Sequence, residues 1–243
     1  MKKTTLLLLA SFYFFSVGAQ TKIYNSSSFE MIFSFAKIQK GGNEINSNLR
    51  FSPVFNFQSL VNYDISQGFG IFHGMSIRNV GFIYDIPGTD SMMKYRTYNI
   101  GIPLGIKIGN IKNGFFIYGG YEFEMPFHYK EKLFINDDKK DITSIWFSNR
   151  TNWYTQSVFI GFNTKSGFNI KLKYYLDGFF NQDYVGTYNG ARIKPFQDMN
   201  AHVIYFSLNW NLFKDVKNYG KEFRKPKSKT EAKSYSYIIS HDR

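Results

Sequence analysis

The stretch Tyr98-Asn99-Ile100-Gly101-Ile102-Pro103-Leu104-Gly105-Ile106-Lys107-Ile108 decides the fold class. Its even positions are all Tyr, Ile or Leu, whereas its odd positions are Asn, Gly, Pro and Lys. Such a period of two is typical of a strand with one apolar and one polar face. About eight stretches between residues 29 and 213 alternate in this way, and the clearest others are 49–65, 115–129, 168–176 and 202–213. The pattern predicts an all-β fold, an eight-stranded antiparallel up-and-down transmembrane β-barrel.

The connections between these stretches alternate in length. Residues 64–68, 109–114 and 164–167 form short turns rich in Gly, Asn and Ser. Between them lie longer loops at residues 39–48, 84–93, 130–152 and 178–199. Outer-membrane barrels keep short turns on the periplasmic side and long loops outside. We therefore predict a bacterial outer-membrane location with both termini in the periplasm.

The polar faces of the stretches carry charges that would point into the barrel. Eight strands enclose a space that side chains can fill, and buried charges persist there only when they are paired. We predict a lumen charge network of Arg50, Asp64, Arg78, Arg96, Lys107, Glu122, Glu124, Lys171, Lys173 and Asp177. An acid/base pair or proton path through Glu122 and Glu124 is the alternative, but residues two apart on a strand simply share a face. The stretch from Phe69 changes phase near Asn79, which predicts a β-bulge there.

Composition supports an envelope protein. Residues 1–19 have a basic start, a short apolar core and a small-residue cleavage site, so we expect a signal peptide. No later run of about 18 apolar residues is present, which excludes a bundle of membrane helices. The 27 Phe and 18 Tyr are typical of lipid-facing aromatic belts, and the absence of Cys leaves no disulfide. We assign residues 20–213 to the barrel and 214–243 to a basic, flexible periplasmic tail.

The search for chemistry yields little. Parity places His128 inward near the outer rim. His128 with Glu124 or Asp177 is the weak catalytic candidate, because a rim hydrolase would need a His with an acidic partner. No nucleotide, metal or cofactor motif is present, so we expect no cofactor and no metal. We expect a non-catalytic barrel with a side-chain-filled lumen. It would serve envelope structure, adhesion or a membrane assembly, and an outer-membrane enzyme or a narrow channel is the alternative.

Partners are suggested by the aromatic residues and by the tail. Trp146, Trp153, Tyr184 and Trp210 are predicted interface aromatics, which would make outer-membrane lipid a partner. The loop after Gly178 is a second aromatic segment, for either binding or the same belt. The tail carries nine basic and four acidic residues, so it accounts for +5 of the formal charge of +12. A periplasmic address makes nucleic acid implausible, and a periplasmic or membrane protein is the possible partner; a tail that binds nothing is equally open.

Three segments resemble small outer-membrane β-barrel proteins of Bacteroidota, the group that includes PorT-like barrels. They are Phe72-His73-Gly74-Met75-Ser76-Ile77-Arg78-Asn79-Val80-Gly81-Phe82, residues 96–107 (RTYNIGIPLGIK) and residues 171–176 (KLKYYL). The resemblance covers about residues 20–213 and implies the barrel architecture. It is a poor guide to activity, although PorT itself is linked to type IX protein secretion. The tail departs from barrels that end at a terminal aromatic residue, the position that Phe213 would occupy here.

Overall fold

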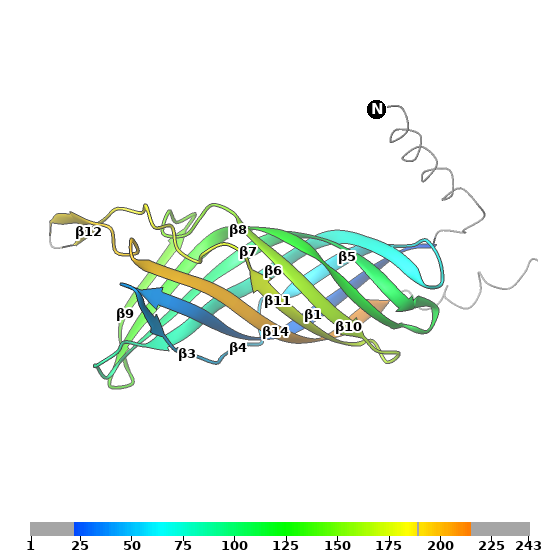
Figure 1. The fold of residues 1–243 in the computed structure, drawn as a ribbon, viewed down its shortest axis with the longest axis horizontal. Helices are drawn as coiled ribbons and strands as arrows, with labels where there is room; N and C mark the ends of the chain where they lie inside the picture. The colour runs from blue at the N-terminus through cyan, green and yellow to red at the C-terminus, as the bar shows by residue number, and fades with distance from the viewer. Residues whose placement is uncertain (1–21, 189, 215–243) are drawn as a thin grey trace, which may run out of the picture. The chain divides into compact units, whose positions relative to one another are not determined.

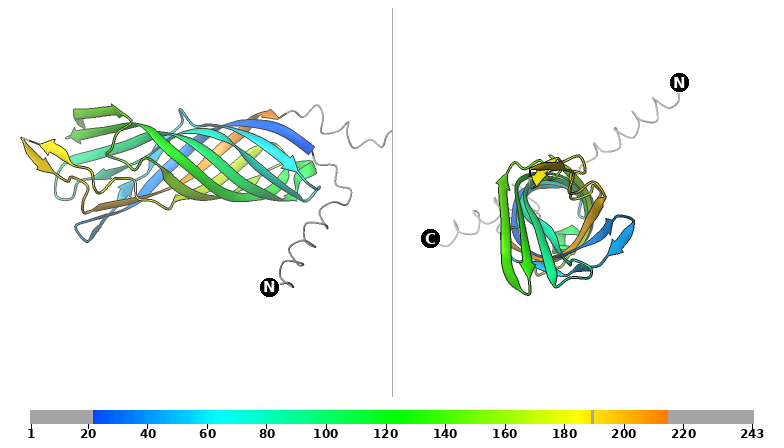
Figure 2. Two further views of the ribbon diagram at one scale, coloured as in Figure 1. Left: turned by 90° about the horizontal axis from the view of Figure 1, so that it is seen from above. Right: turned by 90° about the vertical axis from the view of Figure 1, so that its left-hand side faces the viewer.

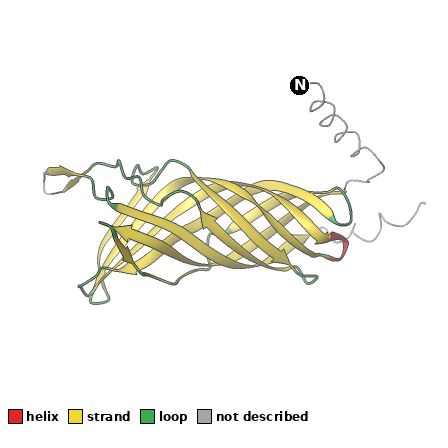
Figure 3. Ribbon diagram, in the orientation of Figure 1, coloured by secondary structure: helices red, strands yellow, loops and turns green. Residues whose placement is uncertain are grey.

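The computed structural model describes residues 22–188 and 190–214. The predicted signal peptide and almost all of the predicted tail lie outside these residues. Within them, the chain is nearly all antiparallel β-strand, with one short 3₁₀ helix, η2 (Ile111–Asn113), in a turn (Figure 3). No helix in this described part is long and apolar enough to cross a membrane.

Eight strands of the described chain form a closed ring (Figures 1 and 2). In spatial order they are β1 (Lys22–Lys40), β5 (Phe57–Asp64), β6 (Phe69–Asp85), β7 (Ser91–Asn110), β8 (Phe115–Ile135), β10 (Thr155–Asn163), β11 (Phe168–Tyr175) and β14 (Met199–Lys214). The antiparallel pairing of β8 with β10 and the contact of β14 with β1 close the ring. The predicted eight-stranded antiparallel barrel is confirmed.

Several short strands and one hairpin extend the ring at one end. They are β2 (Asn43–Ile45), β3 (Ser47–Asn48), β4 (Arg50–Ser52), β9 (Asp138–Trp146), β12 (Gly186–Tyr188) and β13 (Ala191–Ile193). β9 pairs with β8 beyond the place where β8 meets β10, so the β8–β9 hairpin rises away from the ring (Figure 2). We call the end of the ring that carries these strands the loop end, and we call the opposite end the turn end.

The turn end is built as the short-turn prediction requires. β5 and β6, β7 and β8, and β10 and β11 are joined there by the three predicted short turns. Asn110 caps η2 through its side-chain oxygen, which accepts from the amide of Asn113, and Gly114 ends the turn at φ 73°. A left-handed φ is cheap only for glycine, so this position fixes the tight reversal into β8.

The barrel has its apolar face outside and its polar face inside. Along β7, Ile102 and Leu104 are 50% and 53% exposed, whereas Lys107 is 2% exposed. The same alternation holds on β1, where Phe35 is exposed and its neighbours Ser34 and Ala36 are buried. A protein dissolved in water would show the reverse order, because burial of apolar area is the main force for folding. The surface is therefore that of a barrel with lipid as its solvent.

Two local predictions about the strands are wrong. The stretch 49–65 is interrupted between β4 and β5, where Pro53 cannot donate to the ladder and Phe55 has φ 61°. No bulge occurs near Asn79, because the register of β6 with β7 is constant from Phe69 to Asp85. The apparent phase change arises because Val80, Phe82 and Tyr84 are apolar residues that face inward.

Strand β8 contains the irregularity instead. Tyr98 pairs with His128 but Asn99 pairs with Pro126, so Phe127 is an extra residue on β8. A bulge of this kind exchanges the two faces of the strand beyond it. Beyond the bulge, much of the predicted loop 130–152 is strand, which carries the sheet past the ring.

Candidate functional site: the filled lumen and its outer rim

The centre of the lumen holds six charged side chains that we call the central cluster. Its members are Glu30, Arg78, Glu122, Glu124, Lys171 and Lys173, all within 3% of complete burial. Arg78 lies 2.7 Å from Glu30 and 3.1 Å from Glu122. Lys171 lies 2.5 Å from Glu30, and Lys173 lies 2.6 Å from Glu122 and also contacts Glu124. Three carboxylates and three cations therefore balance in charge.

Neutral side chains complete the hydrogen bonds of the cluster. The hydroxyl of Tyr175 donates to Glu124 at 2.8 Å, and the amide of Asn99 donates to the same carboxylate at 2.7 Å. Ser76 donates to Glu122. Buried carboxylates cost several kcal/mol each unless their oxygens are satisfied in this way. These contacts explain how ions can be stable in a closed lumen.

A second ion pair closes the turn end. The ammonium of Lys107 lies 2.6 Å from Asp64 and also donates to Asn62 and to the hydroxyl of Tyr24. Between this pair and the central cluster lies an apolar layer of Phe72, Tyr118 and Phe159. The lumen is thus occupied at the turn end as well as at the centre.

At the loop end the lumen is closed by rings, which we call the aromatic plug. Its members are Phe82, Tyr95, Phe179, Phe180 and Phe196. Phe180 stacks on Phe196 at 4.3 Å between centroids and meets Tyr95 edge-on at 4.9 Å. The loop that follows β11 therefore folds into the barrel mouth. Sequence reasoning missed the plug, since it took the loop after Gly178 for a belt or binding segment.

Arg150 lies in the loop between β9 and β10 and anchors that loop beside the plug. Its guanidinium lies 3.0 Å from Glu131 and 5.3 Å from the ring of Tyr184. Partial burial alone would lower the pKa of Arg150, but Glu131 together with the hydroxyls of Tyr129 and Tyr184 outweighs it and holds that pKa above its usual value. Arg150 is therefore charged, and it anchors the loop.

The structure places most of the predicted network residues in the lumen, but three behave differently. Arg50 is buried and donates to Asn79 at 2.5 Å, so its partner is an amide and not a carboxylate. Asp177 lies just beyond β11 and accepts from the backbone of Gln156 at 2.6 Å. The prediction for Arg96 is wrong, because inward positions of β7 are odd-numbered and Arg96 lies on the outer face. Glu30 is not among the predicted network residues, although its alternation with Phe29 and Met31 assigns it to the polar face.

The weak catalytic candidates are not brought together. The bulge at Phe127 turns His128 to the outer face, where its Nε2 lies 2.9 Å from the hydroxyl of Ser144. Its ring lies 4.6 Å from that of Trp146. Glu124 is enclosed in the central cluster on the other face of β8. The predicted inward position of His128 is wrong, and the predicted pair of His128 with Glu124 has no geometric basis.

Three of the four predicted interface aromatics face outward. Trp146, Trp153 and Trp210 are 65%, 71% and 56% exposed. Tyr184 is different, because it is half-buried beside Phe196 and Arg150. It therefore supports the plug and is not part of an outer belt.

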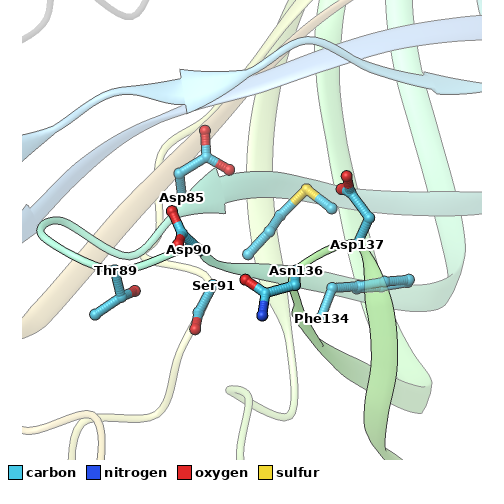
Figure 4. Close-up of a pocket in the computed structure, with 8 residues that line it drawn as sticks. Asp85, Thr89, Asp90, Ser91, Phe134, Asn136 and Asp137 are labelled. Carbon is cyan, nitrogen blue, oxygen red and sulfur yellow. The ribbon is translucent and has the colours of Figure 1, made fainter.

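A pocket of about 510 Å³ lies at the tips of the loop end, between the β6–β7 and β8–β9 turns (Figure 4). Asp85, Asp90 and Asp137 line it together with Phe134 and Asn136. Asp85 already accepts from the amide of Asn48 at 3.0 Å. No group of three or more His, Cys, Asp or Glu in the described chain is arranged to hold a metal ion.

Comparison with known proteins adds little to the geometry. No family model matches the chain, and no curated protein matches it. Among solved structures, Ail, the attachment invasion locus protein of Yersinia pestis in complex with the heparin analogue sucrose octasulfate, is 12% identical with a TM-score of 0.35. The match covers 76% of this chain and 97% of Ail. Neisserial surface protein A is 10% identical with a TM-score of 0.34, covering 77% and 99%. Likenesses at this level carry no functional information, and the PorT-like resemblance stays a prediction.

Proposed function

We propose that the protein is a non-catalytic integral barrel of the bacterial outer membrane that holds its loop end outside the cell as a platform. The single observation that supports this is the filled lumen. The central cluster is within 3% of complete burial, and the aromatic plug lies above it. A barrel closed along its length neither conducts nor admits a substrate, so its useful surfaces are the outer wall and the loops.

The loop end has the features of a platform. The β8–β9 hairpin and the loop after it expose Trp146, Phe147 and Trp153 at 65%, 74% and 71%. β9 forms the end of the strand path, and none of the described strands pairs with its other edge, which can therefore accept another strand. Adhesion and attachment to a membrane assembly, such as one for type IX secretion, both fit such a surface. The barrel itself would contribute to envelope structure.

Single-channel recording on the purified, refolded chain tests the closed lumen. We expect no steady conductance from the natural chain. We expect the same from a Phe179→Ala/Phe180→Ala variant, because the central cluster lies below the plug. Steady conductance from the natural chain would overturn the closed-lumen proposal and favour the channel. Conductance from the variant alone would show that the aromatic plug, and not the central cluster, seals the lumen.

Cysteine labelling tests the orientation, and the chain is suited to it because it contains no Cys. Lys140→Cys lies on β9 at the loop end, and Ser166→Cys lies in the turn between β10 and β11. A membrane-impermeant maleimide should label the first variant in intact cells and the second only after the outer membrane is opened. The reverse pattern would place the loops in the periplasm.

A further inference from the structure

Four cations face each other on the outer wall of the barrel near the loop end. Lys94 pairs across the sheet with Lys132, and Arg96 pairs with Lys130. All four side chains are half-buried. We call these residues the cationic patch. Like charges directly opposite on neighbouring strands repel each other, so this arrangement is unfavourable unless something neutralises it.

The part of the chain that the structure describes does not neutralise the patch. No described carboxylate forms an ion pair with any of its four residues. Glu131 lies between Lys130 and Lys132 on β8, so its side chain is on the opposite face, where it pairs with Arg150. Asp141 lies opposite Leu133, which is also on that face, and accepts from the amide of Ile142. Glu131 and Asp141 therefore belong to the other face. Asp85 lies on the outer face of β6, opposite Met92, but it accepts from the amide of Asn48 at 3.0 Å and forms no ion pair with the patch.

The position of the patch relates it to the membrane boundary. Tyr98, His128 and Trp146 form one row across β7, β8 and β9, with ring centroids 5.4 Å and 4.6 Å apart. On one side of this row lie exposed Ile100 and Met125 of the apolar wall. On the other side lie Arg96 and Lys130, two residues further along their strands and thus roughly 7 Å away. Aromatic rows of this kind lie at the level of lipid headgroups.

Rings also hold the cations in place. The guanidinium of Arg96 lies 5.6 Å from the ring centroid of Tyr98, and the ammonium of Lys94 lies 4.4 Å from that of Phe134. Such contacts reduce the freedom of long side chains before a ligand arrives. A guanidinium can bind two phosphate oxygens at once, and the ammonium groups add further donors.

We infer that the cationic patch binds the phosphate groups of a phosphorylated glycolipid whose acyl chains lie against the apolar wall. This inference rests on the proposed outer-membrane location. The chemistry that recognises the ligand is the combination of an apolar wall, an aromatic row and, beyond it, four unneutralised cations in two successive rungs. A phosphorylated saccharide headgroup presents anions at that height, and its acyl chains occupy the layer below.

The test compares lipid binding by two variants of the full chain in phosphatidylcholine nanodiscs. The patch variant is Lys94→Gln/Arg96→Gln/Lys130→Gln/Lys132→Gln. The control variant, Lys37→Gln/Lys40→Gln/Lys165→Gln/Arg192→Gln, removes the same charge from exposed positions elsewhere. The probes are diphosphoryl lipid A, the same lipid without its phosphates, and inorganic pyrophosphate, each scored by native mass spectrometry.

We expect the natural chain and the control variant to bind diphosphoryl lipid A within about twofold of each other, and the patch variant to bind at least about tenfold more weakly, because it loses its charge-assisted contacts. The natural chain should bind the dephosphorylated lipid more weakly by a similar factor, and its binding of diphosphoryl lipid A should weaken in high salt. Equal binding by both variants, or no discrimination between the two lipids, would overturn the inference. If the natural chain bound pyrophosphate as tightly as diphosphoryl lipid A, the patch would be a site for free anions, and the lipid assignment would be overturned.

Insertion is scored separately, by the heat-dependent shift in electrophoretic migration and by protection from protease in vesicles. A chain that fails to insert contradicts the proposed function. A chain that inserts but fails to discriminate contradicts only the lipid inference.

Discussion

Replacing Arg78 with methionine is expected to destabilise the folded barrel by about 3–5 kcal/mol, the usual cost of removing one partner from a buried ion pair. Arg78 lies 2.7 Å from Glu30 and 3.1 Å from Glu122, and none of the three side chains is exposed. Without Arg78 the central cluster has three carboxylates against two lysines. The uncompensated negative charge is fully buried, so the effect should be at the upper end of single substitutions.

A second substitution turns this into a test of the mechanism. Glu122→Gln added to Arg78→Met restores charge balance, since Lys171 keeps Glu30 and Lys173 keeps Glu124. We expect the double variant to be more stable than Arg78→Met alone, which requires a coupling free energy larger than the cost of Glu122→Gln by itself. Lys140→Gln is the control, because its pair with Asp138 is exposed, and it should change stability by less than about 0.5 kcal/mol.

The assay is urea unfolding of the refolded chain in detergent micelles, followed by tryptophan fluorescence. Trp146, Trp153 and Trp210 are all on exposed positions, so the substitutions do not touch the reporters. A loss below about 1 kcal/mol for Arg78→Met would mean that the lumen charges are hydrated. A double variant less stable than Arg78→Met would refute the pairing scheme.

Two further predictions concern single positions on β8. Gly120→Ala should prevent folding in vesicles, because an added Cβ would overlap the carbonyl oxygen of Leu104. Gly119→Ala is the control and should fold, because its Cβ would lie 3.3 Å from the carbonyl of Phe159. Equal folding yields of the two variants, read from the gel shift, would contradict the packing argument. His128→Ala should leave the lipid and protein profiles of the outer membrane unchanged, because His128 is separated from Glu124 by the wall of the barrel. An altered profile with normal folding would revive the rim enzyme.

Several features of the barrel were predictable because they depend on local chain geometry. Successive side chains on a strand point to opposite faces, so alternation alone places Ile102 outside and Lys107 inside. Turn composition likewise identified the three short turns and the strand order around the ring. The inward position of Glu122 and Lys173 follows from the same parity, without any knowledge of their partners.

Other features depend on contacts between distant segments. The bulge at Phe127 exchanges the faces of β8 beyond it, which turned His128 outward against its apparent parity. The loop aromatics Phe179 and Phe180 fill the mouth because apolar residues of β6 and β7 already face inward there. No sequence period reports either event, since each depends on how neighbouring strands and loops meet.

By itself, the sequence determined that the chain forms a barrel with an apolar exterior and a charged interior, because a period of two is a property of each strand alone. Only the tertiary structure decided which charges meet. Glu30 and Lys171 are 141 residues apart and contact because β1, β14 and β11 are neighbours in the closed ring. Lys94 and Lys132 oppose each other because the β7–β8 register sets them level. Register and closure are properties of the whole sheet, and no single strand encodes them.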